Sequence, residues 1–173
     1  ASFTGLTMSN AEVEVTVHAK VMHTLPASGV IDLNLHFTGA QGWTAESAQA
    51  DPAFLLVLDR FKEIYAQAAI TVGEITWRDI DPIYQVIEDV GTGGGDLHEL
   101  FQQSEGNALN AVNLFFVDEL LTGFGQGFGV ILGVAGGIPG PPLRQGTRKS
   151  GVAIAVKPVP EAPATVDTTM AHE

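Results

Sequence analysis

The sequence contains no cysteine among its 173 residues. Disulfide bonds, cysteine-ligated zinc and cysteine nucleophiles are therefore excluded. Basic residues are scarce: eight Lys and Arg stand against 20 Asp and Glu, a formal net charge of −12. Nucleic acids and anionic membranes are bound by clustered basic side chains, so neither is expected as a partner. The acidity is typical of a solvated surface, with attraction of basic substrates as the alternative.

A long uninterrupted apolar helix is also missing. Residues 120–143 carry no charge and have about the length of a membrane-spanning helix, but glycines recur through them and prolines follow at 139, 141 and 142. Each glycine costs a helix about 1 kcal/mol relative to alanine. This stretch therefore predicts a glycine-rich loop that leads into a strand, and no membrane span. The N-terminus also shows no basic region followed by an apolar core, so no signal peptide is visible.

The apolar content is that of a folded domain. Hydrophobic residues make up 45% of the chain, and the mean hydropathy is +0.20. A chain of this length buries roughly two thirds of the surface that it exposes when unfolded. We therefore predict a single domain over residues 1–173.

Alternating apolar and polar residues predict two strands with one solvent-exposed face each, at residues 11–22 and 30–37. The turn-like residues 26–29 between them suggest that the two strands pair as a hairpin. Further strands are expected at residues 70–78, 111–117, 130–135 and 151–156. The run at 111–117 is almost entirely apolar, which predicts a strand covered on both faces.

Helix signals lie between these strands. Asp51 as N-cap and Pro52 at the first helical position predict a helix over residues 51–69. Its apolar face is expected to contain Leu55, Leu58, Phe61, Ile64 and Tyr65. Asp96 is expected to cap a short helix with Leu97, Leu100 and Phe101 on one face, and residues 167–173 begin a third helix. The order predicts an α/β domain of α+β layered type, with a twisted mixed sheet of about five or more strands and two packed helices.

The pair His172-Glu173 lies on this third helix. It equals the first half of the motif H-E-x-x-H, in which two histidines four residues apart face one metal ion on a helix. The same dipeptide occurs at His98-Glu99, where Gln102 stands at the position of the second histidine. His98 is therefore expected to be a surface or hydrogen-bonded histidine.

Three segments of the chain resemble the N-terminal subdomain of zincin metallopeptidases, especially the pappalysin- and cytophagalysin-like members of the metzincin branch. These segments are residues 112–117, 133–140 and 168–173, which read VNLFFV, GVAGGIPG and TTMAHE. In that family a core strand is followed by an edge segment rich in Gly, Ala and Pro, then by a strand and the zinc-binding helix. Before residue 112 the resemblance extends only to the order of elements.

The resemblance implies a secreted or cell-envelope zinc endopeptidase that hydrolyses peptides with zinc-activated water. His172 would be a Zn²⁺ ligand and Glu173 the general base. An edge strand would bind an extended peptide or protein substrate by strand addition, with a plain surface loop as the alternative. Its residues would be Gly133, Val134, Ala135, Gly136 and Gly137.

The remaining ligands of that family's site would lie beyond Glu173. A catalytic zinc needs three protein ligands, so the 173 residues alone are expected to be an inactive fragment. They would contact the missing C-terminal part of the same protein. A non-catalytic binding or adhesion domain is the alternative function, and a chance His-Glu pair is the alternative origin of the motif.

Other candidate sites are weaker. Histidines at 18, 23 and 36 lie on or near the first two predicted strands, where exposed histidines without a function are favoured over a surface metal pair. The acidic side chains that could bind Ca²⁺ lack the spacing of a calcium loop, so a solvated acidic loop is favoured. They are Asp79, Asp81, Glu88, Asp89 and Asp96. The glycine runs match no nucleotide-binding motif.

Overall fold

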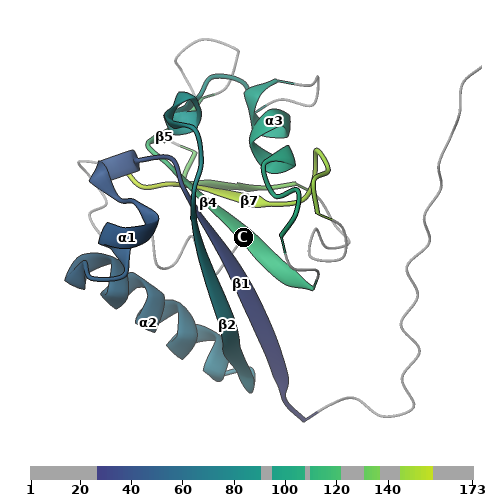
Figure 1. Ribbon diagram of the computed structural model, residues 1–173. Helices are drawn as coiled ribbons and strands as arrows, with labels where there is room; N and C mark the ends of the chain where they lie inside the picture. Colours follow the sequence, from purple (N-terminus) through teal and green to yellow (C-terminus); the bar gives the residue numbers. More distant parts are fainter. Residues whose placement is uncertain (1–26, 91–94, 108–109, 122–130, 137–144, 158–173) are drawn as a thin grey trace, which may run out of the picture.

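The structure is a computed structural model that describes residues 27–90, 95–107, 110–121, 131–136 and 145–157 (Figure 1). The predicted strand at 11–22 and the predicted helix at 167–173 lie outside these residues. So do His18, His23, Gly137, His172 and Glu173.

The centre of the fold is a five-stranded mixed sheet in the order β2-β1-β4-β7-β6. The strands are β1 (Gly29–Phe37), β2 (Ile70–Asp79), β4 (Ala111–Val117), β6 (Gly133–Ala135) and β7 (Val152–Ala155). The first four in this order run parallel, and β6 is antiparallel to β7. A small second sheet pairs β3 (Val86–Ile87) with β5 (Glu119–Leu120). The predicted α/β class with a mixed five-stranded sheet is therefore confirmed.

Helices cover both faces of the sheet (Figure 1). Phe54, Leu58 and Phe61 of α2 (Pro52–Ala66) are buried in one cluster with Leu33 and Leu35 of β1. Leu97, Leu100 and Phe101 of α3 (Asp96–Gln102) are buried in a second cluster with Phe115 of β4. The shorter elements are η1 (Ala40–Gly42), α1 (Ala45–Ala48) and η2 (Pro82–Gln85). No helix among the described residues is long and apolar enough to cross a membrane.

The start of α2 is as predicted. The Asp51 side chain accepts hydrogen bonds from the backbone N–H groups of Phe54 and Ala53 at 3.0 and 2.7 Å. These bonds lower the pKa of Asp51, because they favour the carboxylate, with the bond from Phe54 contributing most. The predicted apolar face was partly wrong: Leu55 is exposed, and the buried side starts one residue earlier at Phe54.

The capping prediction for α3 was wrong. Gly95 is the N-cap, Asp96 is the first helical residue, and its carboxylate accepts a hydrogen bond from the Glu88 N–H at 3.2 Å. The buried residues of this helix, Leu97, Leu100 and Phe101, are those predicted.

Two predictions about β1 were also wrong. The strand has parallel neighbours on both edges, β2 and, from Asp32 to Phe37, β4, so most of its length has no free edge for a hairpin partner. Its polar side is not exposed to solvent: Asn34 and His36 are buried, with exposed fractions of 1% and 0%. A central strand between two helical layers has no solvent-exposed face where both layers cover it.

The tight packing between β7 and α3 predicts the effect of adding one carbon. A Cβ at Gly151 would lie 2.5 Å from a ring carbon of Phe115 and 2.7 Å from one of Phe101, both fully buried. We expect Gly151→Ala to lower the free energy of unfolding by about 1–3 kcal/mol, as overpacked cores do. Urea denaturation measures it.

Gly29→Ala is the matched control. Its Cβ would lie 3.6 Å from the Ile70 side chain, an ordinary contact, so a change within about 0.5 kcal/mol is expected. Equal stability of the two variants would contradict the packing of β7 against α3.

Candidate functional site

The edge strand β6 contains four of the five residues that the sequence assigned to substrate binding. Gly133, Val134 and Ala135 pair with Ile154, Ala153 and Val152 of β7, and Gly136 follows directly. All four are half-buried. Among the described residues β7 is the only strand beside β6 in the sheet, and Ile131, two residues before β6, forms an isolated antiparallel bridge with Leu120.

The hydrogen bonds of β6 show which of its groups point outward. Gly136 N donates to the Gly151 carbonyl, and Ala155 N donates to the Leu132 carbonyl, both at 2.9 Å. Successive residues of a strand point their backbone groups to opposite sides. The backbone groups of Leu132, Val134 and Gly136 therefore face β7, and those of Gly133 and Ala135 face away from it.

Gly136 has a structural reason to be glycine. A Cβ there would lie 2.5 Å from the Lys149 carbonyl oxygen and 2.7 Å from its carbonyl carbon. The backbone before β7 therefore already occupies the space of a side chain. The small residues here were expected to allow a substrate backbone to approach, but at Gly136 the packing of the chain itself is a sufficient reason for glycine.

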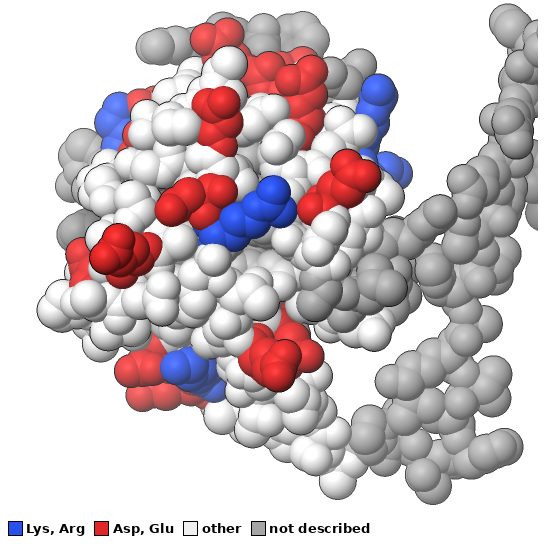
Figure 2. All heavy atoms as spheres, in the orientation of Figure 1, with Lys and Arg blue, Asp and Glu red and all other residues white. Residues whose placement is uncertain are grey.

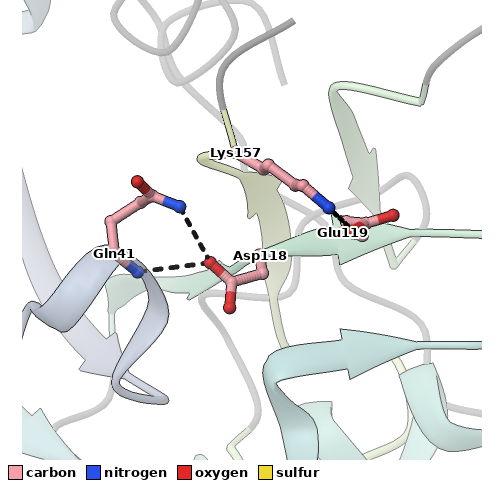
Figure 3. Close-up of polar contacts among 4 residues, drawn as sticks. All are labelled: Gln41, Asp118, Glu119 and Lys157. Carbon is pink, nitrogen blue, oxygen red and sulfur yellow. Dashed lines mark hydrogen bonds and ion pairs between the residues drawn. The ribbon is translucent and has the colours of Figure 1, made fainter.

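Besides the β6 edge, a group of polar side chains lies where the central strands end (Figure 3). It consists of Gln41, Asp118, Glu119 and Lys157. Asp118, after β4, accepts hydrogen bonds from the backbone N and the side-chain Nε2 of Gln41, both at 3.2 Å. Gln41 has a φ of 54°, which is unfavourable for a residue with a side chain. The Asp118 carboxylate thus holds the turn after β1 in place.

Beside it, Lys157 forms an ion pair with Glu119 (Figure 3). The hydrogen bond and charge of Glu119 raise the pKa of Lys157. The pair is largely exposed, and such pairs contribute little to stability. It ties the end of β7 to β5. Sequence reasoning missed this group, since its members are far apart in the chain.

Another polar group is buried on the α3 side of the sheet and centres on Asn113 of β4. The Asn113 Oδ1 accepts from Asn34 Nδ2 at 3.0 Å and from Asn107 Nδ2 at 3.1 Å. Its Nδ2 donates to the Ser150 carbonyl at 2.8 Å and to Gln145 Oε1. This group joins the two central strands to the loops before β4 and β7.

His36 belongs to the same group. Its ring stacks on Phe115 with centroids 4.3 Å apart, and its Nε2 lies 2.9 Å from Asn107 Nδ2. Nδ1 has no hydrogen-bond partner among the described residues. Burial lowers the pKa of His36 to about 4, against a smaller raising effect of Asn113, and the charge of Arg78 lowers it further. His36 is therefore neutral at pH 7, and the predicted exposed strand histidine was wrong at this position.

Three of the acidic side chains considered for calcium, Asp79, Asp81 and Asp96, accept hydrogen bonds from backbone N–H groups. Asp79 accepts from the Ala45 N–H at 2.7 Å, and Asp81 accepts from the Ile83 N–H at 2.9 Å. In the described part of the chain no group of three or more His, Asp or Glu could hold a metal ion. His98 is half-buried, and its Nδ1 has no hydrogen-bond partner within that part.

Acidic side chains are spread over the visible face of the molecule, with few basic ones among them (Figure 2). No protein-family model, curated protein or solved structure matches the chain.

The buried His36 predicts a dependence of stability on pH. Its pKa is lower in the folded state than the value of 6.5 that an exposed histidine has, so the unfolded state binds the proton more readily. The contribution of neutral His36 is complete above pH 6.5 and is lost as the pH falls towards 4. The loss amounts to about 3 kcal/mol.

Urea denaturation between pH 7 and pH 4 checks this, with His36→Gln as the control that cannot titrate. Wild type should lose about 3 kcal/mol more than the variant over this range. Identical losses would mean that His36 is accessible to protons in the folded state.

Proposed function

We propose that this chain is the N-terminal subdomain of a zincin-like zinc endopeptidase of the metzincin branch, and that β6 binds an extended peptide substrate. The observation that carries the proposal is the place of β6: it is the antiparallel edge strand of an otherwise parallel sheet. It precedes β7, and the His172-Glu173 pair follows β7 in the chain. This is the order of elements in the family that the sequence resembles.

Strand addition explains how β6 would recognise a peptide. The outward backbone groups of Gly133 and Ala135 offer donors and acceptors in the spacing of a β-ladder. Main-chain pairing of this kind binds many sequences, because it does not read the side chains of the substrate. It would hold the substrate backbone extended along the sheet.

Within the proposal this chain supplies one metal ligand, His172, and one base, Glu173. Among the described residues no group of three or more His, Asp or Glu is arranged so that it could hold a metal ion. The other ligands would follow Glu173 in the same protein, so the 173 residues alone are proposed to be inactive. A zinc ion bound there would activate the attacking water, and Glu173 would hold the proton of that water.

Substitution of Glu173 tests the chemistry in the longest natural form of the protein that contains this chain. Glu173→Ala should lower cleavage of an unfolded protein substrate by about 100-fold or more while the bound zinc stays stoichiometric, because general acid–base catalysis contributes that much. Substrate cleavage and metal content are measured on the same sample. A chelator should abolish the wild-type activity.

His98-Glu99 offers a matched control. Glu99 is exposed on α3 and follows a histidine in the same way, so Glu99→Ala should keep full activity. Full activity of Glu173→Ala would refute the role of Glu173. A wild-type protein that binds no zinc and cleaves nothing would favour the alternative, a non-catalytic binding or adhesion domain.

A separate substitution tests the edge strand. Ala135→Pro removes an outward N–H while leaving the bonds to β7, which proline tolerates on an edge strand. One lost hydrogen bond should lower kcat/KM for a long peptide about 3- to 10-fold. Ala135→Ser keeps the N–H and should behave as wild type. Equal kcat/KM in both variants would contradict substrate pairing at β6.

A further inference from the structure

The opposite edge of the sheet is formed by β2, a ten-residue strand. Within the described residues its one neighbour is β1. The apolar side chains Val72, Ile75 and Trp77 pack against the main core cluster but are only half-buried. Ile70, at the start of the strand, is also half-buried. Long open edges of this kind attract other strands, so natural proteins pair, cover or charge them.

The sequence predicts one further strand, which lies outside the described residues. Residues 13–21 alternate apolar and polar side chains without interruption, with the apolar ones at Val13, Val15, Val17, Ala19 and Val21. The neighbouring strand along the chain, β1, already has β2 and β4 on its two edges. A strand at residues 13–21 that enters this sheet must therefore pair at an outer edge.

The spacing of apolar residues on β2 is irregular because the strand contains a bulge. Between the pairs Ile31↔Val72 and Leu33↔Ile75, one β1 residue, Asp32, stands opposite two β2 residues. The Asp32 carboxylate accepts a hydrogen bond from the Glu74 N–H at 2.8 Å. A Cβ at Gly73 would collide with that carboxylate, so the bulge is fixed by the sequence.

An antiparallel strand of residues 13–21 fits this pattern in two registers that differ by two residues, and the one with the shorter connection to β1 is as follows. Val15 comes opposite Trp77 and Val17 opposite Ile75, and the bulge takes up the extra residue. Ala19 then stands opposite Val72, and Val21 opposite Ile70. Four of the five apolar residues thus meet an apolar residue on the same face, which favours cross-strand pairing, and Val13 stands opposite Asp79.

The polar side of this register is compatible as well. Thr16 stands opposite Thr76, and Glu14 stands opposite Arg78, which has the opposite charge. On β2 both Thr76 and Arg78 are exposed.

The length of the connection agrees with the same register. Gly29, the first residue of β1, is paired with Ile70 on the inner edge of β2. Val21 would lie beside Ile70 on the outer edge, so residues 22–28 must cross two strand spacings, about 10 Å. These residues could span twice that distance, at about 3.3 Å per residue. Residues 22–28 include Pro26, and Gly29 comes directly after them. Proline and glycine are both typical of turns.

We propose that residues 13–21 pair with the outer edge of β2, antiparallel, as a sixth strand of the sheet. This strand would cover the half-exposed apolar side of β2 and leave β6 as the open edge of the sheet. The proposal is independent of the proposed peptidase activity, because it concerns the other edge and needs no metal.

Cysteine cross-linking of the full chain tests the proposal, and the absence of native cysteine makes the result unambiguous. Thr16→Cys with Thr76→Cys places two cysteines directly opposite each other, about 5 Å apart at their Cβ atoms. We expect an intramolecular disulfide in most molecules after mild oxidation, seen as a mobility shift on a non-reducing gel and confirmed by peptide mass. Protection of residues 70–79 from hydrogen exchange should be unchanged by the bond.

Two matched variants fix the register. Glu14→Cys or His18→Cys, each combined with Thr76→Cys, places the second cysteine diagonally, about 7–8 Å away, where a disulfide is strained. These should form at least about tenfold less cross-link under the same oxidation. Preference for either diagonal pair would overturn the register.

Two further outcomes would overturn the pairing itself. No intramolecular bond in any of the three variants would mean that residues 13–21 do not lie at β2. A disulfide-linked dimer of Thr76→Cys alone at micromolar concentration would mean that the edge pairs with a second copy of the chain.

Discussion

The central pair of strands, β1 and β4, sets the constraint on which the rest of the structure depends. Each strand is hydrogen-bonded on both edges, and both are largely buried. Polar groups in such a place must find partners inside the protein. Asn113 meets this demand, because its one side chain binds Asn34 on β1 and the backbone before β7. The network therefore fixes where the loops that precede β4 and β7 lie, and with them the start of β7.

The position of β6 follows from that arrangement. Once β7 is held beside β4, its other edge is open, and the chain before it returns antiparallel to fill that edge. Gly136 allows the close approach to Lys149 at the end of this short strand. The edge with outward backbone groups at Gly133 and Ala135 is thus a consequence of the sheet's centre, and it is the edge at which we propose that a peptide adds.

Much of this fold could be predicted from the sequence, for reasons that individual residues show. Asp51 and Pro52 act locally, so the start of α2 was predictable. The apolar run of β4 predicted a strand buried on both faces. The burial of Asn34 and His36 was not predictable, because alternation looks the same whether the polar side meets water or meets Asn113, a residue far along the chain. Local patterns cannot report partners that only folding brings together.

The candidate site divides in the same way. The Gly133–Ala135 edge could be anticipated because its composition and its order before β7 are local features. The Asp118 and Lys157 contacts could not, since each joins distant strand ends. Gly136 must be glycine because the Lys149 backbone occupies the space of a side chain. The sequence pattern alone had suggested that a substrate backbone needs this space. Small residues at a sheet edge therefore support a binding role only where the chain's own backbone does not already require them, so the proposed binding role rests on the outward backbone groups of Gly133 and Ala135.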